Sequence, residues 1–347
     1  MKLDKLDKKL LILQSVIIII LFTVNIYIFD YIKEVEKETM EARGAGSISL
    51  EQASVLAMHQ FHDYAQKQIN ALKHGLDTHS CEVLDYVLKC MEYERFLKYA
   101  SFMPRAFSFP KFHAFHLDKW EKELASLNEI YGVFRGEIGS EIFYFHHGLR
   151  FANKKIQNYV RNRDIIDAGA GGGDSLMVLS KYTDKTIYCY EFSDNDLKCF
   201  AETVGNNKIC SRYKLIPSAL GESVRKICNY KDRVKSRTML IGSSKEPINM
   251  TTIDEEVKKH NMVVGFIKTD VEGYSMPVMK GAIKTIQSQR PVLSLGIYHN
   301  HEELFKIKPF LEQRLTGYIY EFHLQTFKKG DFNEMMLLCY PKELAES

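Results

Sequence analysis

From residue 163 onward, short apolar runs alternate with amphipathic segments, and this alternation is the strongest constraint on the fold. Seven runs have the length and residue types of strands, namely 164–169, 186–192, 213–220, 263–271, 291–299, 318–327 and 333–340. Helical patterns fall between most of them, at 173–182, 194–204, 252–260, 274–288 and 301–314. This order predicts an α/β fold with a mostly parallel seven-stranded sheet covered by helices on both faces. A short KKGDF turn joins the last two runs, so the sheet is expected to end in an antiparallel hairpin.

The stretch DIIDAGAGGGDS, residues 164–175, joins the first predicted strand to the first predicted helix. Ligands of open α/β sheets bind at the carboxyl ends of strands, so Gly169 and Gly171 are expected to bring backbone close to a cofactor. The spacing does not fit G-x-G-x-x-G, because the sixth position from Gly169 is Asp174. A pyrophosphate would also be repelled by Asp167 and Asp174. We therefore disfavour an NAD oxidoreductase and expect a cofactor with positive charge and no phosphate, such as S-adenosylmethionine.

Polar residues also end the second and the fourth predicted strands. Glu191 follows Gly171 by 20 residues, a position from which a carboxylate can accept hydrogen bonds from ribose hydroxyls. Lys268, Asp270 and Glu272 alternate with apolar residues at the end of the fourth strand. The alternation directs these side chains to one cleft, where Asp270 is the best placed, and Glu272 has the alternative role of capping the next helix.

Six blocks of the sequence occur in the order found in FkbM-type methyltransferases. They are IIDAGAGGGDS, CYEFS, IPSALGES, TTIDEEV, FIKTDVEGYSMPVMKGA and RPVLSLGIYHN. Residues 142–342 are thus similar to this S-adenosylmethionine-dependent family. The resemblance implies a class I, Rossmann-like methyltransferase that O-methylates mainly sugar or polyketide hydroxyls.

The resemblance also implies roles for single residues. The implied cofactor residues are Asp167, Gly169, Gly171, Glu191, Ser218 and Ala219. The first three would form the cofactor turn, the acid after the second strand would hold the ribose, and the last two would flank the adenine. Asp270 would face the reaction centre. Many family members carry an acid at the end of the fifth strand, where this chain has Gly296, and this departure argues against a metal-assisted mechanism.

Two side chains are candidates for the general base that removes the proton of the acceptor hydroxyl. His299 follows an apolar strand, and its ordinary pKa suits a base at neutral pH. Asp270 is the other candidate, and a lone histidine at a strand end is more often structural, so both alternatives stay open. His146 and His147 could roof the cofactor, although packing explains them better.

The N-terminal region carries a second kind of signal. Residues 10–29 form a stretch of 20 uncharged residues, which is long enough to cross a bilayer as a helix. A charged segment follows in place of a cleavage site, so residues 1–30 are expected to be an uncleaved anchor. Residues 31–141 then form a helical stalk and cap, and residues 142–347 form the catalytic domain.

Two arguments about the orientation of this anchor point to opposite sides of the membrane. Four Lys residues precede the span and three Lys or Arg follow it, a difference that slightly favours an external domain. S-adenosylmethionine is made in the cytoplasm, and the seven cysteines match no zinc spacing and suit a reducing compartment. We therefore expect a single-pass membrane protein whose catalytic domain is cytoplasmic.

The net charge of +3 gives no argument for a nucleic-acid partner. Two basic runs, 150–163 and 225–237, could face anionic headgroups, although a solvated surface explains them better. The function we expect is O-methylation of a sugar hydroxyl on a glycan or lipid-linked saccharide at the membrane. The alternative is a non-catalytic, membrane-anchored binding or scaffold protein that keeps the fold.

Overall fold

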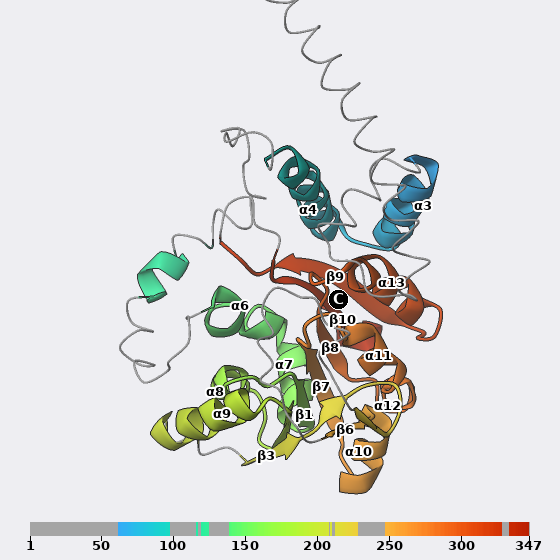
Figure 1. Cartoon of the computed structure of the whole chain (residues 1–347). Helices are drawn as coiled ribbons and strands as arrows, with labels where there is room; N and C mark the ends of the chain where they lie inside the picture. Colours follow the sequence, from blue (N-terminus) through green and yellow to red (C-terminus); the bar gives the residue numbers. More distant parts are fainter. Residues whose placement is uncertain are drawn as a thin grey trace, which may run out of the picture. The chain divides into compact units, whose positions relative to one another are not determined.

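A seven-stranded sheet lies at the centre of the fold (Figure 1). The structure is a computed structural model that describes residues 62–97, 116, 119–124, 139–207, 209, 212–227, 247–327 and 333–346. The strands of this sheet are β1 (Asp164–Ala168), β2 (Thr186–Glu191), β3 (Arg212–Pro217), β7 (Val264–Thr269), β8 (Val292–Gly296), β9 (Tyr318–Leu324) and β10 (Met335–Pro341). Their order across the sheet is β3-β2-β1-β7-β8-β10-β9. Only β10 runs antiparallel to its neighbours, β8 and β9, so the predicted parallel sheet with a terminal antiparallel hairpin is confirmed.

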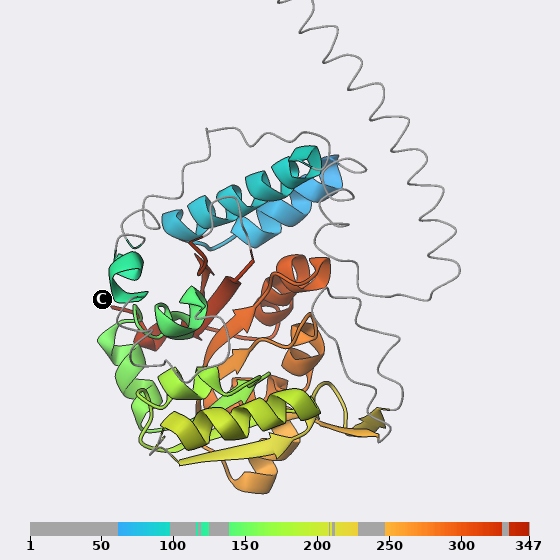
Figure 2. The same cartoon turned by 60° about the vertical axis from the view of Figure 1, so that its left-hand side comes forward.

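Helices cover both faces of the sheet (Figures 1 and 2). One face carries α6 (Ser140–Phe143), η1 (His146–Gly148), α7 (Lys154–Arg161), α8 (Asp174–Leu179) and α9 (Asp194–Asn207). The other carries α3 (His62–Lys73), α4 (Thr78–Leu97), α10 (Ile253–His260), α11 (Ser275–Lys280), α12 (Ile283–Gln289) and α13 (His301–Glu312). A short turn, η3 (Lys342–Leu344), closes the described chain beside α7. The two faces bury two separate apolar clusters, as expected when both sides of a parallel sheet are covered.

The alternation of strand side chains decides which residues face which helices. Along β1, Ile165 packs in the cluster on the α8 side of the sheet, whereas Ile166 packs in the cluster on the α11 side. The side chain of Asp167 points to the same face of the sheet as that of Ile165, two residues earlier. The residue beside Asp167 on β7 is Lys268, whose side chain points to the same α8 side as that of Phe266. The period of two thus brings a carboxylate and an ammonium group together at the centre of the sheet.

Side-chain caps begin the helices that frame the carboxyl ends of the strands. Thr252 accepts a hydrogen bond from the backbone N–H of Glu255 at the start of α10. Asn300 caps α13 in the same way by accepting from the N–H of Glu303. These caps satisfy N–H groups that have no partner inside the helix, and they set where each helix leaves its strand.

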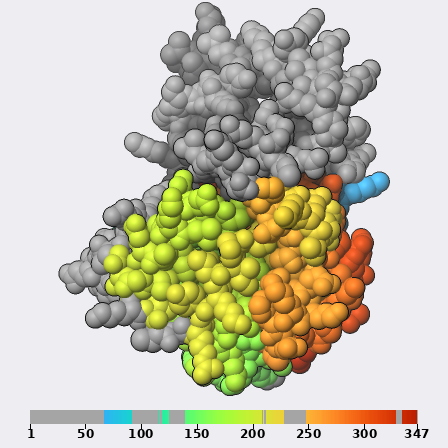
Figure 3. Space-filling view, turned by 60° about the horizontal axis from the view of Figure 1, so that its bottom comes forward, coloured from blue at the N-terminus to red at the C-terminus, as the bar shows by residue number. Residues whose placement is uncertain are grey.

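Two predicted elements are split in the structure. The predicted helix 274–288 is two helices, α11 and α12. The break lies at Gly281, where a Cβ would lie 2.0 Å from the carbonyl oxygen of Gly221. The predicted strand 213–220 is also wrong as one element. It divides into β3 and the first strand of a three-stranded sheet, which is formed by β4 (Ala219–Leu220), β5 (Arg225–Ile227) and β6 (Ile248–Thr251). In Figure 3 the yellow surface of this small sheet adjoins the orange surface around α10.

The N-terminal predictions lie largely outside the described residues. The predicted membrane span 10–29 and residues 31–61 of the predicted stalk and cap are among the residues that are not described. Within the described part of the chain, no helix combines the length and the apolar composition needed to cross a membrane. The described part of the predicted helical region 31–141 contains α3 and α4.

The close approach at Gly281 predicts a stability difference between two glycine substitutions. Gly281→Ala should lower the free energy of unfolding by about 2 kcal/mol or more, because the methyl group would overlap a backbone oxygen. Gly205→Ala in α9 is the control. Its Cβ meets no atom within 4 Å, so it should raise stability by about 0.5–1 kcal/mol through helix propensity. Urea unfolding followed by circular dichroism measures both, and equal effects would contradict the packing described.

Candidate active site

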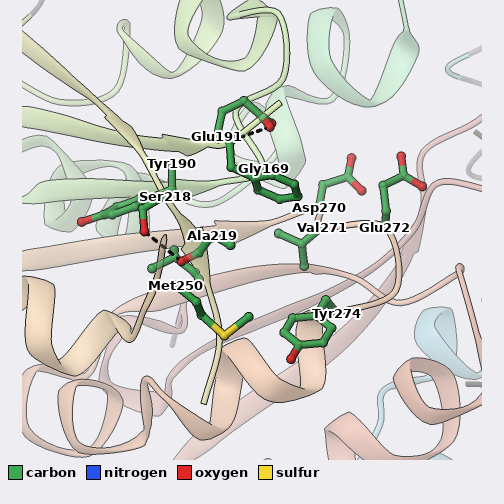
Figure 4. A pocket seen from close by; sticks show the side chains of 12 residues that line it. Gly169, Tyr190, Glu191, Ser218, Ala219, Met250, Asp270, Val271, Glu272 and Tyr274 are labelled. Carbon is green, nitrogen blue, oxygen red and sulfur yellow. Dashed lines mark hydrogen bonds between the residues drawn. The ribbon is translucent and has the colours of Figure 1, made fainter. Parts of the chain in front are cut away.

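A cavity opens at the carboxyl ends of β1, β2 and β7. Its walls are formed by Gly169, Tyr190, Glu191, Phe192, Ser218, Ala219, Leu220, Met250, Asp270, Val271, Glu272 and Tyr274. In Figure 4 the carboxyl groups of Asp270 and Glu272 lie at one end, and Ser218, Ala219 and Met250 lie at the other. Five predicted site residues therefore line one cavity, and Gly171, Asp167 and His299 do not.

Glu191 lies between the two ends of the cavity and is held by backbone amides (Figure 4). Its Oε1 accepts hydrogen bonds from the N–H groups of Phe192 at 2.7 Å and Ser193 at 2.8 Å. Its Oε2 accepts from the N–H of Gly171 at 3.2 Å. Burial raises the pKa of Glu191, and these three donors oppose that shift. The carboxylate is thus fixed in orientation, with lone pairs left for hydroxyl groups of a ligand.

The glycine turn lies directly against the end of β7. Gly169 has φ +80°, and a Cβ there would come 1.9 Å from the backbone oxygen of Asp270. Both conditions require glycine at this position. The N–H groups of Gly169 and Ala170 bind the carbonyl of Tyr190, and the N–H of Asp270 binds the carbonyl of Ala168, each at 3.0 Å. The predicted close approach of backbone to the cavity is therefore present at Gly169.

Asp167 lies below this turn and does not reach the cavity. Its side chain is fully buried, and its Oδ1 lies 3.1 Å from Nζ of Lys268, which is itself buried. Lys268 also donates to the carbonyl of Gly169 at 2.7 Å. The prediction that Asp167 contacts a cofactor from the cavity wall is thus corrected, because strand parity points it into the α8 side of the sheet. Its link to the cavity runs through Lys268 and the turn.

Burial raises the pKa of Asp167 to about 6, and the charge of Lys268 opposes the rise. The pKa of Lys268 would be lowered by burial, but Asp167, Asp270 and Asp174 raise it above its usual value. Lys268 is therefore a cation at neutral pH. Neither carboxylate oxygen of Asp167 has a hydrogen-bond partner among the described residues, since the contact with Lys268 is an ion pair without hydrogen-bond geometry.

The opposite end of the cavity is built around Asp270. Its Oδ1 accepts a hydrogen bond from the hydroxyl of Tyr298 at 3.3 Å and lies 3.4 Å from Nε2 of His299. The side chain is 29% exposed, so part of the carboxylate remains open to the cavity.

His299 stands behind Asp270 and is surrounded by acids. Its Nδ1 lies 3.1 Å from Oε2 of Glu303, and its Nε2 lies 3.6 Å from Oε2 of Glu272. Burial alone would lower the pKa of His299, but Glu303, Asp270 and Glu272 raise it to about 9. The ring is therefore an imidazolium at neutral pH and has no lone pair for a proton. Of the two candidates for the general base, this geometry favours Asp270 over His299.

Two acidic residues at this end, Glu303 and Glu334, were not predicted from the sequence. Glu303 is fully buried in α13, and Glu334 lies in the connection before β10 with φ +65°. Burial first, and then Asp270 and Glu141, raise the pKa of Glu334 to about 9, so this side chain is a neutral carboxylic acid. The N–H of Ser275 at the start of α11 binds Glu303, so the suggested capping role of Glu272 is also wrong. The one sequence feature that indicates this contact is the four-residue spacing of His299 and Glu303, which can bring two side chains together in a helical segment.

His146 and His147 do not line the cavity. His147 is buried and its Nε2 lies 2.9 Å from the hydroxyl of Ser175 in α8. His146 contacts the hydroxyl of Tyr182 at 2.7 Å, and burial lowers its pKa to about 4. Packing against α8 accounts for both. Among the described residues no group of three or more His, Cys, Asp and Glu has the arrangement of a metal site.

The cavity fits S-adenosylmethionine better than a dinucleotide. Three carboxylates line it, and no Lys or Arg is among the described lining residues. A sulfonium or ammonium group is attracted by these charges, whereas a pyrophosphate is repelled. Glu191 would hold a ribose, and Ser218, Ala219 and Met250 offer a mostly apolar end for a base.

The comparisons with known proteins agree with this geometry. The sequence profile of the methyltransferase FkbM domain matches residues 172–338. Residues 172–338 are an FkbM methyltransferase domain. The match covers β2 to β10 and includes Glu191 and Asp270, whereas Asp167, Gly169 and Gly171 precede it. A comparison with proteins of curated function finds no match.

A solved methyltransferase structure shares the fold of this chain. The methyltransferase FkbM from Methylobacillus flagellatus KT has a TM-score of 0.53 and 18% identity, covering 89% of this chain and 70% of that chain. An rRNA methylase from Streptococcus thermophilus has a TM-score of 0.37 and 9% identity, covering 59% and 99%. A protein from Streptococcus mutans assigned as a methyltransferase, in complex with SAH, has a TM-score of 0.33 and 10% identity, covering 53% and 94%. The first of these likenesses establishes a methyltransferase fold.

The buried ion pair between Lys268 and Asp167 predicts a large loss of stability in Lys268→Met. That change leaves the Asp167 carboxylate buried without a cation and should lower the free energy of unfolding by about 3–5 kcal/mol at pH 8. The loss should shrink at pH 5, because protonation removes the unpaired charge. Asp167→Asn in the same background should restore part of the stability. The exposed Lys284→Met is the control, with a change within about 0.5 kcal/mol in urea unfolding. A pH-independent loss would contradict this assignment.

The imidazolium of His299 predicts a dependence of stability on alkaline pH. Its folded pKa, about 9, lies above the ordinary value of the unfolded chain, so its contribution is complete below about pH 6.5 and is lost as pH rises through 9. The stability difference between the wild type and His299→Gln should therefore fall by about 2–3 kcal/mol between pH 6 and pH 10. Urea unfolding at a series of pH values measures it. A constant difference would mean that the ring is neutral.

Proposed function

We propose that this chain is an S-adenosylmethionine-dependent O-methyltransferase that acts on a hydroxyl of a glycan or lipid-linked saccharide at a membrane. The observation that carries the proposal is a cavity at the strand ends of a chain with an FkbM domain. The carboxylates of Glu191, Asp270 and Glu272 line this cavity, and no Lys or Arg is among its described lining residues. Such a cavity favours a positively charged methyl donor over a phosphate-bearing cofactor.

The residues of the cavity divide into two sets. The donor would bind with its ribose on Glu191 and its adenine between Ser218, Ala219 and Met250. When bound, S-adenosylmethionine supplies a methyl group on a sulfonium and leaves as S-adenosylhomocysteine. The end that holds Asp270 and Glu272 is then the place of the acceptor hydroxyl. The fixed orientation of Glu191 limits the motion of the donor, which favours in-line attack.

Asp270 is the residue we assign to proton removal. As the acceptor oxygen forms its bond to the methyl carbon, the carbon–sulfur bond breaks with its electron pair on sulfur. The hydroxyl proton passes to the open part of the Asp270 carboxylate. The geometry favours Asp270 over His299, because Asp270 lines the cavity and His299 is already protonated.

The acceptor and the location rest on sequence arguments. A saccharide is proposed from the resemblance to FkbM-type enzymes, and an acceptor side without described cations suits neutral hydroxyls. The membrane is proposed from the uncharged residues 10–29, with the catalytic domain on the cytoplasmic side, where S-adenosylmethionine is made.

Binding and transfer test the proposal together. We expect calorimetry of the full chain in mild detergent to detect S-adenosylmethionine binding, and methyl-tritiated donor to label a saccharide in an extract of cells that lack the protein. Glu191→Gln should weaken binding about tenfold or more, because the amide cannot accept from Gly171 and the backbone N–H groups at once. Glu255→Gln, exposed on α10, is the matched control and should bind normally.

The outcomes separate the alternatives. A folded chain that binds no S-adenosylmethionine would overturn the enzyme and favour a scaffold protein. Binding with label in protein or nucleic acid, and none in saccharide, would keep the methyltransferase and reject the acceptor. Binding of NAD in place of S-adenosylmethionine would reject the assignment of the cavity.

A further inference from the structure

Asp270 is held on one of its two oxygens. Tyr298 donates to Oδ1 at 3.3 Å, and Nε2 of His299 faces the same oxygen at 3.4 Å. The ring of Tyr298 also stacks on that of His299 with centroids 4.0 Å apart. One oxygen is thus engaged from behind, and the partly exposed remainder of the carboxylate points to the cavity. A proton acceptor held in this way presents a single oxygen to a hydroxyl group.

His299 is itself held from the far side by a fully buried acid. Oε2 of Glu303 accepts from Nδ1 of His299 at 3.1 Å and from its backbone N–H at 3.3 Å. Oε1 of Glu303 accepts from the N–H of Ser275 at 3.0 Å. Asn300 anchors this part of α13, because it donates to the carbonyl of Gly273 and caps the N–H of Glu303. The imidazole therefore cannot rotate without breaking buried hydrogen bonds.

The charges around the ring explain why it is kept as a cation. Asp270 and Glu272 face it from the loop after β7, and Glu303 faces it from α13. Glu334 acts on the same ring from the connection before β10 and is neutral, and Tyr298 is a neutral phenol. Three carboxylates thus converge on one imidazolium. Without that cation, their mutual repulsion would push Asp270 away from its present place.

We infer that His299 and Glu303 are positioning residues for methyl transfer, which hold the Asp270 carboxylate turned toward the acceptor hydroxyl. The chain of contacts runs from a buried carboxylate through an imidazolium to the carboxylate at the cavity. His299 and Glu303 touch neither donor nor acceptor in this scheme, since neither lines the cavity. The inference rests on the proposed function for the step that Asp270 performs.

The variants His299→Gln, Glu303→Gln and Asp270→Asn test this inference in the full chain. S-adenosylmethionine affinity, measured by calorimetry, should stay within about twofold of the wild type in the first two, because the donor end is untouched. Transfer of tritiated methyl to the saccharide extract should fall about tenfold or more in both, and about 100-fold in Asp270→Asn. The loss should appear in kcat and leave KM for the donor unchanged.

Two further readouts separate positioning from a general structural role. In His299→Gln the rate–pH profile should lose the alkaline limb near pH 9, at which the imidazolium of the wild type loses its proton. The double variant Asp270→Asn/His299→Gln should be no slower than Asp270→Asn alone, since both changes remove the same unit. His301→Gln is the control. It lies on the same helix, packs on Phe305, and should keep the wild-type rate and profile.

The outcomes are distinguishable. Wild-type rates and an unchanged profile in His299→Gln, or losses that multiply in the double variant, would overturn the inference and leave the methyltransferase intact. If His299→Gln does not fold, Glu303→Gln and the conservative Glu303→Asp carry the same test, with partial rescue expected from Asp. A wild-type chain that binds no S-adenosylmethionine would remove both the proposed function and the inference.

Discussion

The ion pair between Lys268 and Asp167 is the interaction on which the rest of the site depends. It joins β1 and β7 at the centre of the sheet, and Lys268 continues to the carbonyl of Gly169. One buried cation thus fixes both the glycine turn and the strand that ends at Asp270. Removing charges from water is costly, and the pair tolerates burial because each partner supplies the counter-charge of the other.

A second buried cation repeats this arrangement on the acceptor side. His299 stands behind Asp270 and Glu272 as Lys268 stands below the turn. Both cations lie behind the wall of the cavity, so the cavity itself presents carboxylates. The site can concentrate acids next to a cationic donor because their repulsion is balanced from within the protein. This division of charge connects the proposed cofactor to the proposed positioning role.

Much of the fold follows from periodicity in the sequence. The seven strands, the helices between most of them and the antiparallel hairpin were all predictable, because burial on both faces demands apolar strands. Glu191 and Asp270 were predictable for a related reason, since polar residues at strand ends meet at one edge of a parallel sheet. The close approach of Gly281 to Gly221 was not, because the two residues are distant in the sequence.

The sequence by itself determined the sheet, the glycine turn and which strand ends carry acids, because these depend on local pattern and residue type. Tertiary structure decided the protonation and direction of the same side chains. Asp167 is directed away from the cavity by its pairing with Lys268, and His299 becomes a cation because Glu303 and Asp270 converge on it. A pKa depends on burial and on charges brought together from different elements, and no pattern along one chain contains those distances.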